Sequence, residues 1–409
     1  MDARSGFHAS QRLCSHSVLL TRRDNVTPGG GAPESRAPPW SVLPSSFPLL
    51  DPHNGSYCNT PDQLADAVLN GQRERVGGRS DALDSLAGDT KSVFHPHGCS
   101  VPHFGPSRAC QAMSQFSAII VYGDSMMRHL TQGMLALLAG DLAHGATPHL
   151  PEWPASKQEA VHRLCACDGQ FSENDFCRKW QDEDGGQADH PLWFRFTLSR
   201  YRFWLQRDSG PTTDLRSICP AASRLTFLGA FRGFKEANFT GQPSEKVWRE
   251  LLCTGDAGSK ASRPLPALLL LQLGVHGASQ ALKGKGTLGG AFHAYVKPVL
   301  HLASSVARKC GRPLIPWWTG QSAQIAHNDR LYPWQASDAV VPFDRQMKRM
   351  VTSMFQGDEL IAPVRALEFY NLTDGARTDD GYHRLTDVNV AKADVLLHAM
   401  ELSIRPNLS

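Results

Sequence analysis

Residues 115–130 read QFSAIIVYGDSMMRHL, and the rest of the chain can be interpreted outward from this stretch. It begins as a short apolar run with β-branched residues, which is typical of a buried parallel strand. The run stops at Gly123-Asp124-Ser125, and helical spacing follows it, with one face formed by Met127, Leu130, Met134, Leu137 and Leu138. Ser125 is therefore predicted at a strand-to-helix junction, where backbone N–H groups and the positive end of a helix dipole converge. Such a position suits a nucleophile, because the oxyanion formed on attack needs donors already in place. A plain turn with an N-cap serine is the alternative.

Further apolar runs repeat this strand-then-helix order along the chain. Strands are predicted at residues 224–231, 265–273, 313–318 and 364–370, and helices near 291–300, 336–355 and 390–402, the last of them amphipathic. Continuous apolar runs suit a parallel sheet that is covered on both faces. We therefore expect a doubly wound α/β fold with a mostly parallel five-stranded sheet, in which ligands bind at the carboxyl ends of the strands. Ser125, Gly229 and His276 all fall at these predicted ends.

Composition suggests how the chain is divided. Residues 1–90 are predicted to be a largely disordered N-terminal segment or stalk, because the first fifty are rich in Ser, Pro, Gly and Arg, although a weak helix is expected around Leu64 and Val68. Residues 91–409 are predicted to form one catalytic domain. It contains a Cys- and Trp-rich insertion at about 144–223, in which residues 192–197 alternate like a strand. The tryptophans of the insertion suit sugar stacking, but packing inside the core of the insertion is the preferred explanation.

Net charge and glycosylation signals bear on the compartment. The net charge of +3 is close to balance and argues against a nucleic-acid groove, and no apolar run approaches the length of a membrane span. Five N-x-Ser/Thr sequons are present, at Asn25, Asn54, Asn238, Asn371 and Asn407, of which Asn54, Asn238 and Asn371 are the glycosylation candidates. They favour the lumen of the secretory pathway, such as the Golgi, or the outside of the cell. The given N-terminus shows no signal peptide, because its apolar run is too short.

The ten cysteines support the same compartment. Their spacing lacks the paired Cys-x-x-Cys pattern of a zinc site, so Cys165, Cys167 and Cys177 are expected to be disulfides or buried thiols rather than metal ligands. Cys99 and Cys110 bracket a loop just before the key strand. We expect a disulfide between them to brace the approach to the strand.

A nucleophilic serine needs a base and a carboxylate that orients the base. Asp-x-x-His supplies both, and the chain holds two copies, Asp141 with His144 and Asp380 with His383. Asp141 follows Ser125 by one uninterrupted helix, which at about 1.5 Å per residue puts it roughly 20–25 Å away. Asp380 and His383 follow the last predicted strand, in a loop that opens at the same edge of the sheet as Ser125. We therefore predict Ser125, Asp380 and His383 as the catalytic residues.

At these motifs the chain resembles the GDSL/SGNH hydrolase superfamily, and its Gly-Asp-Ser-x-x-Arg, residues 123–128, is closer to the PC-esterase branch. That branch includes plant trichome-birefringence-like polysaccharide O-acetyltransferases and the luminal domains of sialic-acid and capsule O-acetyltransferases. The resemblance implies a three-layer α/β/α fold. It implies that Ser125 accepts the acyl group, that His383 acts as general base and then acid, and that Asp380 orients His383. The Ser125 N–H and Arg128 would face the developing charge, with Gly229 and His276 as further oxyanion- or substrate-binding candidates.

The preferred function is therefore transfer or removal of an acyl group, acetyl above all, on a glycan hydroxyl. Transfer and hydrolysis share an acyl-serine intermediate, and the sequence leaves both open. No cofactor and no metal are expected beyond an acyl donor such as acetyl-CoA or an acetylated glycan, and the expected partner is a glycan or polysaccharide. A catalytically silent glycan-binding protein on the same fold is one alternative. A metallohydrolase that uses Asp124, His276 and His383 is another, and the oligomeric state stays open.

Overall fold

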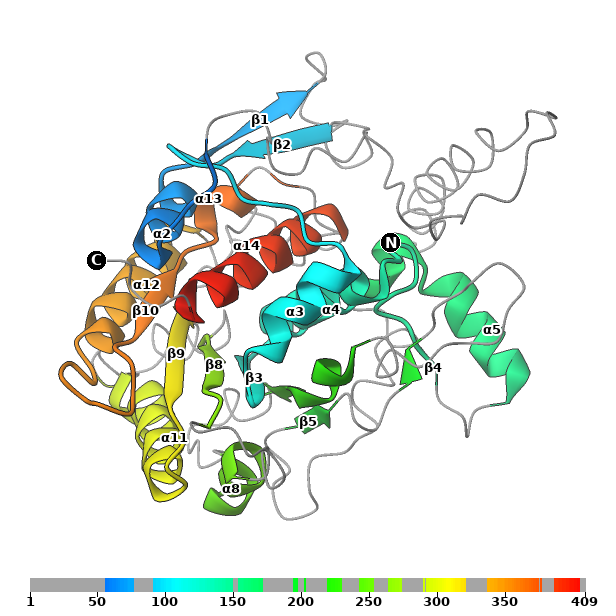
Figure 1. The fold of residues 1–409 in the computed structure, drawn as a ribbon. Helices are drawn as coiled ribbons and strands as arrows, with labels where there is room; N and C mark the ends of the chain where they lie inside the picture. The colour runs from blue at the N-terminus through cyan, green and yellow to red at the C-terminus, as the bar shows by residue number, and fades with distance from the viewer. Residues whose placement is uncertain are drawn as a thin grey trace, which may run out of the picture.

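The computed structural model describes residues 56–76, 91–149, 154–171, 194–197, 202–203, 219–229, 243–253, 264–273, 290, 292–320, 337–374, 376 and 386–404, and every structural statement below concerns these residues. They form an α/β structure (Figure 1). Within these ranges we find no helix that combines the length and the apolar character needed to cross a bilayer.

A six-stranded sheet organises the described part (Figure 1). Its spatial order is β10-β9-β8-β3-β7-β5. The strands are β3 (Ala118–Gly123), β5 (Phe194–Thr197), β7 (Leu225–Gly229), β8 (Ala267–Leu271), β9 (Leu314–Thr319) and β10 (Arg365–Leu367). Five of them are parallel, which confirms the expected five-stranded parallel sheet. The sixth, β5, pairs antiparallel with β7, so a strand that the sequence places in the insertion extends the edge of the main sheet.

The strand order reverses at β3. From β3 the chain continues to β7 on one side, and then returns past β3 to β8 on the other side, followed by β9 and β10. Counted along the chain, the five parallel strands therefore lie in the order 2-1-3-4-5, one of the common orders of doubly wound sheets. The carboxyl end of β3 is consequently the topological switch point, where open α/β sheets leave a crevice for a ligand.

Helices pack against both faces of this sheet. Side chains alternate along β3, so that Ile119 and Val121 belong to one hydrophobic core and Ile120 and Tyr122 to the other. The first core contains residues of α2 (Pro61–Leu69), α3 (Pro106–Ser114), α4 (Ser125–Ala139), α13 (Tyr370–Thr373) and α14 (Thr386–Ile404). The second contains residues of α8 (Glu245–Cys253), α11 (Lys297–Lys309) and α12 (Ser337–Thr352). The apolar runs of the strands are thus covered on both sides, as a parallel sheet requires.

The remaining elements lie around this framework. They are the antiparallel pair β1 (Gln72–Val76) and β2 (Lys91–His95), the short pair β4 (Pro148–His149) and β6 (Arg202–Phe203), helix α5 (Ala155–Leu164), the 3-10 turns η3 (Cys167–Phe171) and η4 (Pro220–Arg224), and the π-helical turn η6 (Phe292–Val296). Of these, η3 matters most for the site described below.

The N-terminal boundary differs from the one expected. The helix predicted around Leu64 and Val68 exists as α2, and both side chains are fully buried in the same core as α14. Its N-cap Thr60 accepts a hydrogen bond from the Gln63 N–H at 3.1 Å. Residues 56–76 therefore belong to the folded part of the chain, which does not begin at residue 91 as expected.

The cysteine pairing also differs. The expected Cys99–Cys110 disulfide is wrong, because Cys99 pairs with Cys58 and Cys110 pairs with Cys219. A parallel β-bridge between Tyr57 and Ser100 brings Cys58 next to Cys99. A third disulfide joins Cys253 to Cys310. These three disulfides, each between two residues that the structure describes, fit a secreted or luminal protein.

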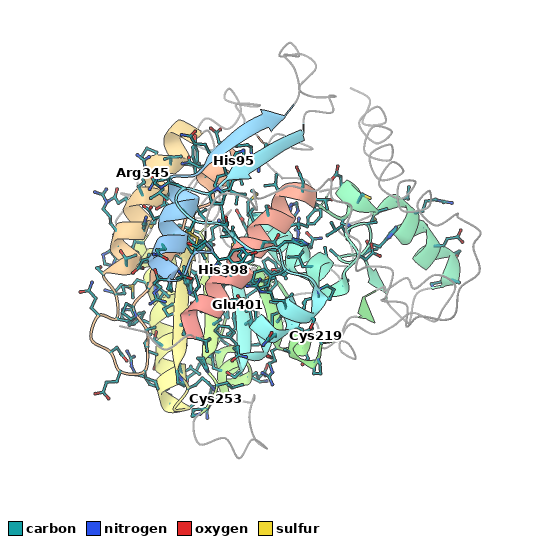
Figure 2. All side chains as sticks on the ribbon, turned by 45° about the horizontal axis from the view of Figure 1, so that its top comes forward. His95, Cys219, Cys253, Arg345, His398 and Glu401 are labelled. Atoms are coloured by element: carbon teal, nitrogen blue, oxygen red, sulfur yellow. A yellow bond between two sulfur atoms is a disulfide. The ribbon has the colours of Figure 1, made fainter. Side chains whose placement is uncertain are left out.

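The final helix is not amphipathic as expected. Helix α14 is buried on nearly all sides, including the polar side chains Lys392, Asp394 and His398. His398 lies within this buried part and Glu401 follows it one turn later (Figure 2). Helices α2, α3 and α4 all contact α14, so a helix that the sequence suggested would cover one face is instead enclosed.

Candidate active site

The strand-to-helix junction that the sequence predicts is present between β3 and α4, but its N-cap is Asp124 and not Ser125. Asp124 is the N-cap of α4, with extended backbone angles, and its Oδ1 accepts a hydrogen bond from the Met126 N–H at 3.0 Å. A Cβ on Gly123 would lie 2.5 Å from Met127 Cγ and 3.1 Å from the Gln272 carbonyl oxygen, so only glycine fits this turn. Ser125 is thus the first residue of α4, directly past the carboxyl end of β3, and it is only 6% exposed.

Two more residues of α4 lie on the side of the helix that carries Ser125. Arg128 and His129 follow it by three and four positions, the spacing at which helical side chains share a face, and both are buried. Arg128 Nη2 lies 3.4 Å from His129 Nε2, which requires His129 to be the acceptor at this nitrogen. The His129 ring meets Phe171 edge to face, with 5.9 Å between centroids. The guanidinium is therefore held one helical turn from Ser125.

The carboxyl ends of the neighbouring strands close around this junction. Gly229 ends β7 directly beside Gly123 in the parallel register, so its predicted place at the strand ends is confirmed. On the other side, the Gln272 N–H donates to the Tyr122 carbonyl at 3.0 Å. The buried Gln272 amide donates to the carbonyls of Thr319 at 3.3 Å and Gly320 at 2.9 Å.

Thr319 extends this contact toward α4. Its hydroxyl lies 3.1 Å from Met127 Sδ and 3.4 Å from the Leu271 carbonyl oxygen. The ends of β3, β8 and β9 are therefore joined by side chains at the edge where Ser125 begins α4.

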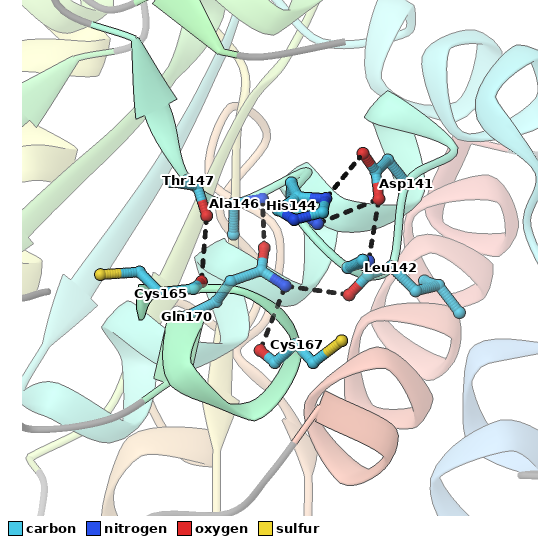
Figure 3. Close-up of polar contacts among 9 residues, drawn as sticks. Asp141, Leu142, His144, Ala146, Thr147, Cys165, Cys167 and Gln170 are labelled. Atoms are coloured by element: carbon cyan, nitrogen blue, oxygen red, sulfur yellow. Dashed lines mark hydrogen bonds and ion pairs between the residues drawn. The ribbon is translucent and has the colours of Figure 1, made fainter. Parts of the chain in front are cut away.

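The Asp-x-x-His pair of Asp141 and His144 has a local structural role (Figure 3). Asp141 follows the left-handed C-cap Gly140 of α4, and its Oδ1 accepts hydrogen bonds from the N–H groups of Ala143 and His144. The His144 ring lies 3.5 Å from Asp141 Oδ2. Burial opposes the charged carboxylate, but these bonds and the charge of His144 outweigh it and lower the pKa of Asp141. At about 1.5 Å per residue, the 15-residue helix α4 separates Asp141 from Ser125 by roughly 22 Å.

Several predicted residues lie outside the described ranges. They are Asp380, His383, His276, Asn54 and Asn238, so their roles stay predictions. Asn371 is described and lies in α13, where its Nδ2 donates to the Leu69 carbonyl oxygen. Thr373 of the same sequon is fully buried and its hydroxyl donates to the Phe369 carbonyl oxygen at 2.8 Å. This packing favours a structural role for Asn371, and glycosylation there stays a prediction.

Metal ligation by the insertion cysteines finds no support. Cys165 and Cys167 are both disulfide-bonded, so neither offers a thiolate. Across the described ranges no group of three or more His, Cys, Asp or Glu side chains is arranged to hold a metal ion. Of the expected disulfides or buried thiols, Cys165 and Cys167 are disulfides, and Cys177 lies outside the described ranges.

Sequence reasoning missed the residues that brace the junction. His129 carries a signal that could have been used, because its i+4 spacing places it beside Ser125 on a helix. Gln272 is the one polar residue inside the apolar run 265–273, another recognisable signal. Asp168 and Gln170 of η3 have no such signal, since their importance depends on contacts with distant parts of the chain.

Comparisons with protein-family models, with curated proteins and with solved structures find no match to this chain, so the functional assignment depends on the residues of the site and their geometry.

Proposed function

We propose that the protein is a serine-dependent enzyme that transfers an acyl group, preferentially acetyl, to or from a glycan hydroxyl. The observation that carries the proposal is the position of Ser125, which begins α4 at the carboxyl end of β3, where the strand order reverses. A serine there lies where doubly wound sheets bind their ligands, and at the positive end of a buried helix. An attacking serine generates an oxyanion, and the backbone N–H groups of a helix start are suitable donors for it.

Arg128 supports the same proposal. Its guanidinium is buried one turn from Ser125 and its orientation is fixed through His129. A guanidinium at this end of the helix would donate hydrogen bonds to the oxyanion that develops during acyl transfer.

The remaining roles belong to the proposal and come from the sequence. His383 would take the Ser125 proton and return it to the leaving group, and Asp380 would orient His383. The acyl-serine would then pass to a sugar hydroxyl in a transferase, or to water in an acetylesterase. An SGNH-like three-layer fold and a site of action in the Golgi or outside the cell are part of the same proposal. The three disulfides and the five parallel strands are compatible with both.

The direct test is labelling with a fluorophosphonate probe, followed by peptide mapping of the adduct. We expect one adduct, on Ser125, and its loss in Ser125→Ala and in His383→Ala at unchanged thermal stability. Asp141→Asn is the matched control, because it changes an Asp-x-x-His pair that lies at the far end of α4, and it should label like the wild type. Absence of label on the folded wild type would transfer the weight to a glycan-binding protein without catalysis. Equal loss in Asp141→Asn would mean that the wrong Asp-x-x-His pair was chosen.

A further inference from the structure

The turn η3 joins two elements that are far apart in sequence. It belongs to the insertion, yet it contacts α4 on one side and the first residue of α14 on the other. The Thr386 N–H, at the start of α14, donates to Asp168 Oδ1 at 3.0 Å. Asp168 thus satisfies an N–H group at the helix start, as an N-cap residue does, but from a different part of the chain.

The contacts between η3 and α4 hold Asp168 in place. The Gln132 amide of α4 donates to the Gln170 carbonyl at 2.7 Å, and Phe171 packs on His129. Gln170 is 3% exposed, so its polar atoms need partners inside the protein.

The Gln170 side chain finds these partners in the loop after α4 (Figure 3). Its Oε1 accepts the Ala146 N–H at 2.7 Å, and its Nε2 donates to the carbonyls of Leu142 at 2.9 Å and Cys167 at 3.2 Å. The Cys167 N–H in turn donates to the Ala143 carbonyl at 2.6 Å.

The backbone of η3 is also unusual. Cys167 has a φ of 50°, in the left-handed region that non-glycine residues rarely adopt. Such a conformation persists only where the surroundings over-determine it, and here the Gln170 bonds and the disulfide-bonded Cys165 and Cys167 do so. The turn is consequently a rigid support on which Asp168 presents its carboxylate.

We propose that Asp168 is a positioning residue for the candidate active site. The inference rests on the proposed function. His383 precedes Thr386 by three residues in the sequence, so the N–H group that Asp168 accepts from lies at the helix start that directly follows the proposed base along the chain. The other side of η3 is fixed to α4, which begins with Ser125. Through η3, Asp168 therefore links the nucleophile helix α4 to the start of α14, the helix that follows the proposed base in the sequence.

Asp168→Ala removes the acceptor, and Asp168→Asn keeps an oxygen in its place. We measure the fluorophosphonate rate constant (kinact) and the probe affinity (KI) separately, together with amide hydrogen exchange at Thr386. We expect Asp168→Ala to speed exchange at Thr386 and to lower kinact on the order of 10- to 100-fold with KI unchanged, because a base misplaced by about 1 Å loses rate at this scale. Asp168→Asn should restore both values to within about twofold, since it retains the acceptor.

Thr60→Ala is the matched control, because it removes a comparable cap from α2, away from η3. It should leave kinact unchanged, whatever it does to thermal stability. An Asp168→Ala protein that exchanges faster at Thr386 but labels at the wild-type rate overturns the positioning role and leaves the proposed function intact. A tenfold loss of kinact in Asp168→Asn, with the Thr386 amide still protected from exchange, also overturns the positioning role. If Asp168→Ala does not fold, the result for Asp168→Asn alone decides. A wild-type protein that takes no label overturns both proposals.

Discussion

The side-chain amide of Gln272, the residue directly after β8, provides a sharp test of the packing around Ser125. Its side chain is 1% exposed and donates to two backbone carbonyls, those of Thr319 and Gly320. Gln272→Glu replaces a double donor with a carboxylate that, when ionised, faces both acceptors and donates to neither. Gln272→Leu is the matched control, because it removes the same two bonds without adding a charge.

The expected magnitudes differ between the two variants. Leucine leaves two carbonyls without this donor, at about 1–3 kcal/mol for a buried unsatisfied group. A fully buried carboxyl group has its pKa raised by up to about 3–5 units, and each unit is worth about 1.4 kcal/mol. Because a folded-state pKa raised this far lies near or above 7, only the interval of about 2.7 pH units between the unfolded pKa of about 4.3 and pH 7 counts, and Gln272→Glu should lose up to about 4 kcal/mol of unfolding free energy at pH 7. Because the raised pKa means that the folded state binds the proton more tightly, this loss should shrink as the pH falls toward the unfolded value of about 4.3.

The assay is urea unfolding of the wild type and both variants at pH 7 and pH 5. We expect Gln272→Glu to be the least stable at pH 7 and to recover relative to Gln272→Leu at pH 5, where its protonated form donates to one carbonyl. A Gln272→Glu protein within about 1 kcal/mol of the wild type at pH 7 would refute the reasoning, because it would mean that the amide is hydrated. The edge of the sheet beside Ser125 would then be open rather than packed.

Two further predictions concern α14. Gly133→Ala places a Cβ 2.3 Å from the Asn389 carbonyl oxygen, an atom of a helix backbone. We expect a net loss of about 2 kcal/mol of unfolding free energy in urea, after the gain of about 1 kcal/mol in helix propensity. An unchanged stability would show that α4 and α14 do not cross this closely. Burial lowers the pKa of His398 although Glu401 and the Cys58 carbonyl oppose this, so the unfolded state takes up the proton first and unfolding free energy should fall below about pH 6.5. His398→Gln should flatten that fall by up to about 1.4 kcal/mol per pH unit. His103, whose pKa is raised, stabilises the folded state as the pH falls and so acts in the opposite direction in both proteins. An identical pH profile of the two proteins would contradict the role of His398.

Local patterns in the sequence determined the parallel strands, the helix after β3 and the turn that carries Ser125. These features could be predicted because they depend on neighbouring residues. A continuous apolar run specifies a covered strand, a 3.6-residue period specifies a helix face, and Gly123-Asp124-Ser125 specifies a turn, although the structure makes Asp124 and not Ser125 its N-cap. The polar residue Gln272 inside its apolar run was visible at the same level, although its contacts were not.

Only the tertiary structure decided which distant residues meet. It pairs Cys99 with Cys58 rather than Cys110, encloses α14 on nearly all sides, and adds β5 to the edge of the main sheet. It also brings Asp168 of the insertion to the start of α14. Each of these contacts joins segments separated by tens to hundreds of residues, so no local period or propensity records it. They form because the sheet brings together strands that are distant in the sequence. Side chains near the strand ends then bond to the groups that this packing places beside them.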